Sequence, residues 1–184
     1  DVAVVVIRGG GDRAFVSGGD LKELATVRTH SEAADMARGV RNVLDRLASL
    51  PVPVIAALNG HALGVAAEAE VAADIRIAAD DVRIGFTQSS LGIMPAWGGV
   101  ERLTQLIGRS RAMLAITTGS QYDAADAQRI GLVDLVVPRA DFDSQWQALA
   151  ASMAATAAGT TRAVKAVINS VASSVHEHSR GEAI

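Results

Sequence analysis

N-G-H-A-L-G-V-A-A-E-A-E-V-A-A-D (residues 59–74) is the segment around which the rest of the chain is organised. The apolar run 52–58 leads into it and predicts a buried strand. Asn59 and Gly60 are turn residues, and Gly64 lets the backbone bend before an alanine-rich helix. The first N–H groups of a helix have no intrahelical acceptor and lie at its positive end. They can therefore bind an anion, or an oxygen that becomes anionic during a reaction.

Glu68 is the acidic residue of interest in this helix. It follows Val65 by three residues, which places both on one face about one turn apart. A backbone donor and a carboxylate are thus expected to face one space. The alternative is a simple strand–turn–helix packing unit with a solvated glutamate. Glu70 lies about 200° around an ideal helix from Glu68 and is expected to face away and to be structural.

Composition limits the classes of protein to consider. Of the 184 residues, 49% are hydrophobic but only 3% are aromatic, so we expect a core of small, closely packed side chains. The formal net charge of −3 provides no global basic field for nucleic acid or anionic membrane. The lack of cysteine excludes disulfides and thiol chemistry and agrees with a cytoplasmic location. No apolar run is long enough for a membrane span, and we expect the natural N-terminus to lie before Asp1.

Strands alternate with helices along the chain, which predicts an α/β fold. We expect a strand buried on both faces at 2–8, and further strands at 52–58, 74–79, 82–86 and 132–137. Helices are expected after Gly64 and at 31–50, 99–106, 110–117, 124–130 and from 141 to about 173. The segment 87–100 is expected to be a loop.

A second glycine-bearing turn, Gly18-Gly19, also follows a strand and precedes a helix. Two such turns from separate parts of the chain can place two N–H groups around one oxygen. Stabilising a thioester enolate requires this arrangement, because the donors must be fixed before charge develops. One glycine turn is a weak signal, and the residues around this pair strengthen it.

These residues resemble the enoyl-CoA hydratase/isomerase, or crotonase, family. The matching segments are 14–23 (A-F-V-S-G-G-D-L-K-E), 53–64 (P-V-I-A-A-L-N-G-H-A-L-G), Glu68, 73–78 (A-D-I-R-I-A), 91–99 (L-G-I-M-P-A-W-G-G), 118–119 (T-G) and 124–133 (A-x-x-A-x-x-x-G-L-V). The resemblance implies a crotonase-type α/β spiral of ββα units with surrounding helices. It implies a crotonase core at 1–140, an incomplete C-terminal helical segment at 141–184, and a homotrimer or a dimer of trimers.

The resemblance also implies roles for individual residues. Gly19 and Val65 match the N–H donors of an oxyanion hole. The usual glycine triplet here reads Gly64-Val65-Ala66, so the N–H survives while the added side chains narrow the space beside the thioester. The implied CoA- and substrate-binding residues are Arg13, Gly18, Lys22, Ala62, Gly64, Pro95 and Trp97. Solvated surface charge is the alternative for the two basic residues, and core packing for the tryptophan. No metal or separate cofactor is implied, since coenzyme A is part of the substrate.

The catalytic pair departs from the family pattern. Glu68 matches the first of two hydratase glutamates, but the second position, four residues before Gly92, is Gln88. With two carboxylates, one water is held between both groups; an amide can position water but has no proton to exchange. The leading hypothesis is a one-glutamate hydratase that adds water to a 2-enoyl-CoA, and the amide speaks against an isomerase.

Two alternatives remain open. One is a decarboxylase or other enolate-forming enzyme, which needs the oxyanion hole alone. The other is a non-catalytic binder of acyl-CoA or of RNA. RNA is disfavoured because the arginines of 31–50 are interrupted by Asp35 and Asp45 and lack aromatic neighbours, so no nucleic-acid or membrane partner is expected.

Overall fold

The computed structural model describes residues 2–18 and 26–181, with side chains described up to residue 172. A four-stranded parallel sheet forms the centre of this part of the chain, in the order β1-β2-β4-β7. Its strands are β1 (Val5–Arg8), β2 (Val54–Leu58), β4 (Ile75–Ala79) and β7 (Leu135–Val137). Every residue of β2 is buried, as its unbroken apolar run predicted.

The first strand differs from expectation. We predicted a strand at 2–8 that is buried on both faces, but β1 begins at Val5 and its residues are half-buried or exposed. The reason is its place in the sheet, because β1 pairs with β2 on one side and forms an edge. A β-branched run does not distinguish an edge strand from a central one.

A smaller sheet contains β3 (Ala62–Leu63), β5 (Arg83–Gly85) and β6 (Gln121–Asp123). β3 runs parallel to β5, and β5 runs antiparallel to β6. The strands β3 and β6 were not predicted, since two or three residues are too few to show a periodic pattern. The smaller sheet is important for the site because β3 leads directly into the helix that carries Glu68.

The helices surround these sheets. They are α2 (His30–Ala48), α3 (Val65–Glu70), α4 (Gly99–Ile107), α5 (Arg109–Thr118), α6 (Ala124–Arg129), α7 (Phe142–Ala154) and α8 (Ala158–Gly181). α2 begins one residue earlier than predicted, because Thr29 caps it in a capping box with Glu32. The predicted single C-terminal helix is interrupted between α7 and α8.

The predicted loop 87–100 also contains regular structure. The 3₁₀ helix η1 (Thr87–Leu91) occupies its first part and ends at Gly92, whose φ is +71°. A second 3₁₀ helix, η2 (Arg139–Asp141), precedes α7. Short 3₁₀ turns leave little trace in sequence because they need only one hydrogen-bonded turn.

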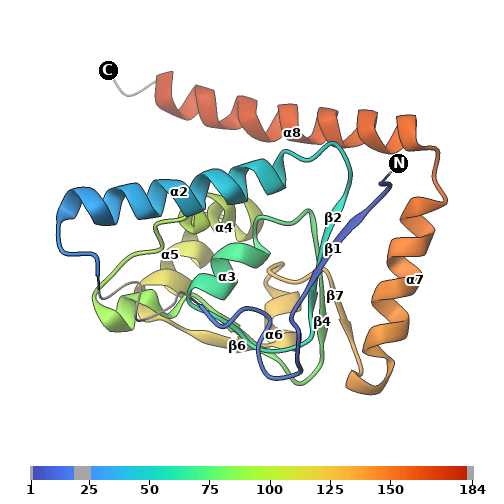
Figure 1. Cartoon of the computed structure of the whole chain (residues 1–184), viewed down its shortest axis with the longest axis horizontal. Coiled ribbons are helices and arrows are strands. Elements are labelled where there is room, and N and C mark those ends of the chain that lie inside the picture. The colour runs from blue at the N-terminus through green and yellow to red at the C-terminus, as the bar shows by residue number, and fades with distance from the viewer. Residues whose placement is uncertain (1, 19–25, 182–184) are drawn as a thin grey trace.

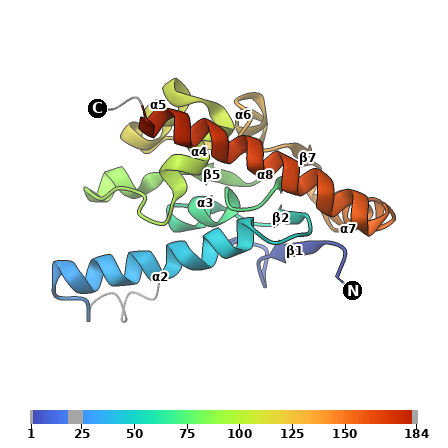
Figure 2. The same ribbon diagram turned by 90° about the horizontal axis from the view of Figure 1, so that it is seen from above.

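The long helices lie outside the sheets. Figure 1 shows α2 along one side of the body, α7 beside the end of the four-stranded sheet, and α8 crossing above. Seen from above, α8 and α2 lie on opposite sides of α3 and α4 (Figure 2). Arg8 at the end of β1 pairs with Asp143 of α7, Nη2 to Oδ1 at 3.1 Å. No helix within 2–18 and 26–181 has both the length and the apolar character needed to cross a bilayer.

Candidate active site

The segment that leads into the first glycine-bearing turn lies beside the second such turn. Ala14 forms a parallel bridge with His61, and the Phe15 N–H donates to the His61 carbonyl at 3.0 Å. A Cβ added to Gly18 would lie 3.4 Å from Cγ2 of Val65. The backbone just before the first turn therefore runs next to the start of α3. Gly19 and Lys22, which the resemblance places at the site, lie outside the described residues.

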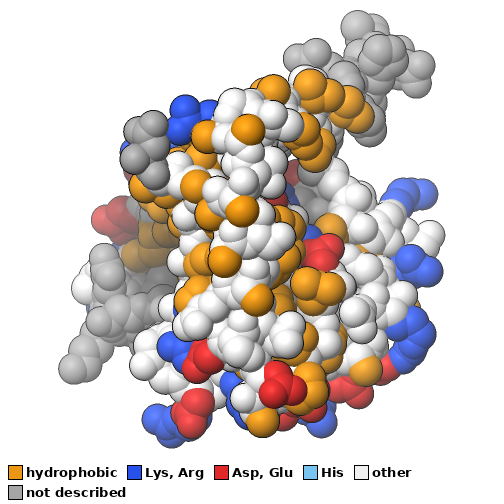
Figure 3. Space-filling model, turned by 90° about the vertical axis from the view of Figure 1, so that its right-hand side faces the viewer, with side chains coloured by type: hydrophobic (Ala, Val, Ile, Leu, Met, Phe, Trp, Pro, Cys, Tyr) orange, Lys and Arg blue, Asp and Glu red, His pale blue; other side chains and the backbone are white. Residues whose placement is uncertain are grey.

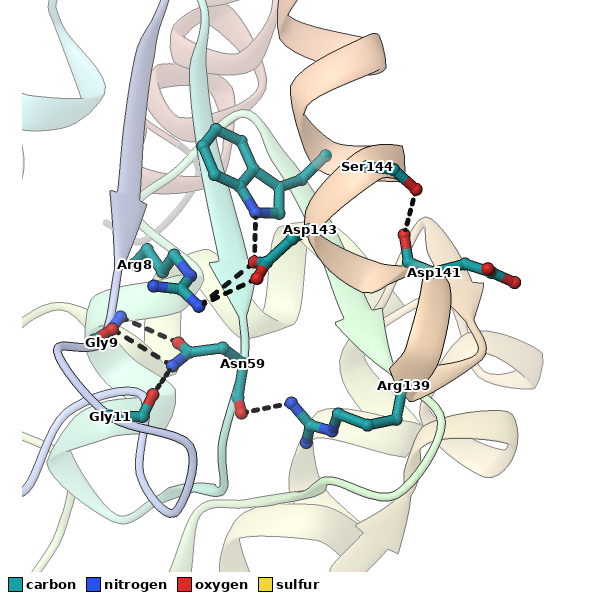
Figure 4. A network of polar contacts seen from close by, with 9 residues as sticks. Arg8, Gly9, Gly11, Asn59, Arg139, Asp141, Asp143 and Ser144 are labelled. Atoms are coloured by element: carbon teal, nitrogen blue, oxygen red, sulfur yellow. Dashed lines mark hydrogen bonds and ion pairs between the residues drawn. The ribbon is translucent and has the colours of Figure 1, made fainter.

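Asn59 joins the segment after β1 to the end of β2. Its Oδ1 accepts a hydrogen bond from the Gly9 N–H at 2.8 Å, and its Nδ2 donates to the carbonyls of Gly9 and Gly11. The Arg139 Nη1 donates to the Asn59 carbonyl at 2.7 Å. Figure 4 shows Asn59 between these partners. We interpreted this residue only as a turn former, and its role in holding the other segment depends on contacts 50 residues apart in sequence.

The helix α3 begins where the resemblance predicts the second oxyanion donor. Gly64 precedes it with φ +62°, a conformation that favours glycine, and its N–H donates to Gly85 of β5 at 2.8 Å. Val65 is the first residue of α3, so its N–H has no intrahelical acceptor. Ala62, in β3, is fully buried beneath this turn.

Glu68 is buried, with only 1% of its surface exposed, so the alternative of a solvated glutamate is wrong. Its Oε2 accepts hydrogen bonds from the N–H groups of Trp97 (2.8 Å) and Gly99 (3.1 Å). Its Oε1 accepts one from the Gln88 Nε2 at 3.0 Å. Burial raises the pKa of Glu68 above its ordinary value, although these hydrogen bonds act in the opposite direction. The carboxyl group is thus fixed in place and biased toward taking up a proton.

Gly99 is close to the Glu68 side chain. A Cβ at this position would lie 2.5 Å from Cγ of Glu68 and 2.8 Å from its Oε2. Only a glycine therefore fits here while the carboxylate keeps its position. The close approach of Gly99, together with the two N–H donors from 97 and 99, was not predicted from the sequence.

Gln88, which the resemblance places at the second catalytic position, lies in η1 and is buried. Its Nε2 is used by Glu68, whereas its Oε1 is buried and accepts no hydrogen bond from any described residue. Buried polar atoms normally have a partner. The pair thus presents one unused amide acceptor beside a carboxylate, which suits a donor such as water or a hydroxyl group.

The other predicted binding residues occupy varied environments. Pro95 is buried and Trp97 is half-buried, with its backbone N–H directed to Glu68. Arg13 and Gly18 are exposed on the segment beside His61. His61 is itself exposed, and its Nδ1 accepts a hydrogen bond from the Arg83 N–H at 3.0 Å.

Glu70 differs from Glu68 although it lies only two residues away. It is completely buried, and within the described structure neither carboxyl oxygen has a hydrogen-bond partner. Burial raises the pKa of Glu70 well above its ordinary value, with a nearby Arg76 lowering it and Asp134 raising it further. Glu70 is not among the partners of the Glu68 carboxylate. The described residues contain no cluster of three or more His, Asp or Glu side chains able to hold a metal ion.

Comparisons with known proteins agree with the geometry. Residues 1–182 match a family model described as enoyl-CoA hydratase/isomerase. The chain is 37% identical over 171 residues to a probable enoyl-CoA hydratase of Mycobacterium bovis, covering 92% of this chain and 64% of that protein. It is 36% identical over 169 residues to a short-chain-enoyl-CoA hydratase of Clostridium acetobutylicum, with the same coverage. The chain thus spans about 64% of the length of these relatives.

Solved structures of enoyl-CoA hydratases also match this chain. An enoyl-CoA hydratase from Bacillus anthracis matches with a TM-score of 0.86 at 37% identity, covering 91% of this chain and 64% of that chain. An enoyl-CoA hydratase/carnithine racemase from Magnetospirillum magneticum matches with a TM-score of 0.88 at 30% identity, covering 92% and 64%.

Proposed function

The chain belongs to the enoyl-CoA hydratase/isomerase, or crotonase, family and has its α/β fold, and we propose that it forms the core of an enzyme that hydrates 2-enoyl-CoA thioesters. The observation that carries this proposal is the Glu68 carboxyl group, which is buried, held by three donors and raised in pKa. A carboxyl group with a raised pKa exchanges protons closer to neutral pH.

In the proposed reaction, the N–H groups of Val65 and Gly19 bind the thioester carbonyl oxygen. Water adds to the β-carbon while the Glu68 carboxylate accepts one of its protons. The carbon–carbon double bond becomes an enolate, whose oxygen charge the two N–H groups stabilise. Glu68 then returns the proton to the α-carbon. The hydroxyl group and the added hydrogen both come from one water molecule, and the glutamate ends ionised as it began.

Gln88 positions this water in the proposal. Its unused Oε1 accepts one hydrogen of the water, and Glu68 Oε1 accepts the other. An amide cannot replace a second catalytic carboxylate, so proton transfer depends on Glu68 alone. Arg13 and Lys22 are proposed to bind the CoA phosphates, and Gly18, Ala62, Gly64, Pro95 and Trp97 to line the thioester site.

One observation favours a second candidate. Because the Gln88 amide does not ionise at neutral pH and cannot serve as a second acid–base group, the site also suits an enolate reaction that needs no such group, such as decarboxylation of a malonyl-type CoA ester. A binder of acyl-CoA without turnover is a third candidate. These functions differ in the product that they form.

The hydratase proposal is tested with crotonyl-CoA and the Glu68→Gln variant. We expect kcat to fall by about 10²–10⁴-fold, since a positioned acid–base group contributes this much. Asp35→Asn is the matched control, because Asp35 is an exposed carboxylate on α2 and should leave the rate unchanged. Equal, non-zero rates in wild type and Glu68→Gln would remove Glu68 from the mechanism.

The alternatives are separated by products and by Gln88→Glu. Incubation with a panel of enoyl- and malonyl-type CoA esters, read by mass, distinguishes added water from lost carbon dioxide. Gln88→Glu is expected to raise hydration by restoring a second carboxylate. Loss of carbon dioxide without hydration supports the decarboxylase, and binding without any product supports the non-catalytic binder.

The resemblance also leads us to propose a homotrimer or a dimer of trimers. Light scattering on the purified protein checks this. A mass of one chain at all concentrations contradicts it.

A further inference from the structure

Arg102, in the first turn of α4, contacts the segment 97–99, whose N–H groups bind the Glu68 carboxylate. Its Nη1 donates to the Trp97 carbonyl at 3.0 Å, and its backbone N–H donates to the Gly98 carbonyl at 3.2 Å. The second of these carbonyls belongs to the same peptide unit as the Gly99 N–H, which donates to Glu68. The Gly98 bond is an ordinary helical bond of the backbone, whereas the Arg102 side chain holds the 97–98 peptide unit, which lies between the two peptide units whose N–H groups bind the carboxylate.

Gly98 shows how closely the guanidinium packs. A Cβ at this position would lie 2.6 Å from Nη1 of Arg102. Gly98 also has φ +90°, so any side chain here would be strained as well as crowded. The local backbone thus depends on both the glycine and the arginine.

The guanidinium is anchored on its other side by α2. Its Nη2 forms an ion pair with Asp45, while Arg41 pairs with Glu101 of α4 at 2.8 Å. The Arg102 side chain is only 14% exposed, whereas Asp45 is half exposed. A fork-shaped guanidinium can bind a carboxylate and a carbonyl at once, which an ammonium does less well. Arg102 therefore connects the long helix α2 to the segment around Glu68.

A cleft of about 490 Å³ lies on the far side of Arg102. Its lining includes Arg41, Asp45, Glu101 and Arg102, with Asn169 and Ala172 contributed by α8. Arg102 and Gly98 thus both lie in the wall of this cleft. Burial lowers the pKa of Arg102, and the negative charges of Asp45 and, to a smaller extent, Glu68 oppose this change.

We propose that Arg102 is a positioning residue that sets the proton affinity of Glu68 by fixing the N–H donors of Trp97 and Gly99 against the Glu68 carboxylate. It does not touch the reacting atoms. Its effect has two parts, the orientation of the two N–H groups and the nearby positive charge. Both favour the ionised carboxylate, in opposition to burial. The inference rests on the proposed role of Glu68 as acid and base.

The groups that act on this carboxyl group come from three elements. Gln88 of η1 and the 97–99 segment contribute neutral donors, and Arg102 of α4 contributes the charge. Asp45 and Arg41 of α2, with Glu101 of α4, act on Arg102 and so only indirectly on Glu68. Loss of Arg102 should therefore raise the pKa of Glu68.

The test compares Arg102→Met with Arg102→Lys. The pKa of Glu68 is followed directly, by the carboxyl carbon resonance in NMR titrations assigned with Glu68→Gln. We expect the titration midpoint of Glu68 in Arg102→Met to lie about one pH unit above that of the wild type. Arg102→Lys keeps the charge but loses the fork, so a smaller rise is expected. The acid limb of the pH profile of kcat/KM should move to higher pH in both variants, and further in Arg102→Met than in Arg102→Lys.

Arg38→Met is the matched control, because Arg38 pairs with Asp35 on the exposed face of α2 and should not change the Glu68 titration. An unchanged Glu68 titration in a folded Arg102→Met or Arg102→Lys protein overturns the proposal. If neither variant folds, Arg102 is needed for folding and the positioning role is also overturned. The NMR titration needs no turnover, so an inactive wild type would contradict the hydratase function without affecting this result.

Discussion

At the scale of single residues, the proposed chemistry depends on the environment of the Glu68 carboxyl group. Three neutral donors bind it, which favours the ionised form, yet burial has the larger effect and raises its pKa. The same residue in an exposed helix would be ionised throughout the neutral range. Its reactivity therefore comes from the surrounding backbone and not from the residue type.

The first prediction concerns pH. The proposed hydration needs Glu68 ionised, so kcat/KM should fall on the acid side as this group takes up a proton. Because its pKa is raised, the midpoint of that fall should lie above the ordinary value of about 4.3 for glutamate. A pH profile with crotonyl-CoA measures this. A midpoint at or below the ordinary value contradicts the assignment.

The second prediction concerns Gly99. In Gly99→Ala the new Cβ would occupy space held by Cγ and Oε2 of Glu68, so the carboxylate must move. Misplacement of a catalytic group by about 1 Å can reduce the rate about 10²-fold, and a loss of this order in kcat is expected. Gly39→Ala is the control, because no atom lies within 4 Å of the added Cβ. Equal rates in the two variants would contradict the close approach.

At the scale of elements, the short helix α3 carries two glutamates with different partners. Glu68 faces the segment 97–99, while Glu70 is completely buried, and its pKa is affected by the charges of Arg76 and Asp134. Arg76 is held by the Ala73 carbonyl and by Asp134, each through its terminal nitrogens, and its Nε is unpaired among the described residues. Among the described residues, both carboxyl oxygens of Glu70 and the Nε–H of Arg76 thus lack a hydrogen-bond partner in the interior.

The third prediction concerns this region. The folded pKa of Glu70 is raised above its unfolded value, so its contribution to stability is complete below the unfolded pKa and is lost as pH rises through the folded pKa. In Glu70→Met the unsatisfied oxygens disappear, and the free energy of unfolding should increase by about 1–3 kcal/mol. Urea unfolding at several pH values measures both effects.

The comparison variant is Glu70→Gln, which cannot ionise. The stability of Glu70→Gln should not decline at high pH. Its free energy of unfolding should increase less than that of Glu70→Met. If wild type and Glu70→Gln respond identically to rising pH, Glu70 is not the group responsible.

At the scale of the whole molecule, α8 is attached to the body through a polar contact. Lys165 donates to the Val52 carbonyl at 2.9 Å and to Asp74 Oδ2 at 2.6 Å, and Asp74 also accepts the Val54 N–H. Beside this contact lies a cleft of about 330 Å³ between α7, α8 and the sheet, with Met153, Val164 and Ile168 in its lining. Figure 3 shows the face that includes α7, with hydrophobic side chains spread over it.

The fourth prediction tests this attachment. Lys165→Met removes both hydrogen bonds and leaves Asp74 without its cation, which should cost about 1–3 kcal/mol of local stability. Hydrogen exchange of α8 amides should therefore accelerate more than that of β2 amides. Arg162→Met is the control, because Arg162 is exposed on the same helix. Equal protection of α8 in both variants contradicts the attachment.

Much of the fold follows from local patterns along the chain. The buried strand β2, the helices α4 and α6 and the start of α3 lie within a few residues of their predicted positions, because apolar periodicity, glycine and capping residues act locally. Local patterns did not predict that β1 is only half-buried or that β3 and β6 are strands. These features depend on which strands pair with one another in the folded sheets.

The amino-acid pattern was sufficient to identify the α/β crotonase fold, and it predicts Glu68 and Gln88 as catalytic residues, because motif spacing and residue types can be compared directly along the chain. It did not reveal that Asn59 holds the segment after β1 through Gly9 and Gly11, or that the N–H groups of Trp97 and Gly99 bind Glu68. It also gave no sign that Arg102 supports that segment. Every residue except proline has a backbone N–H. Which of these groups meet a carboxylate therefore depends on the path of the folded chain, which is decided only when distant segments pack together.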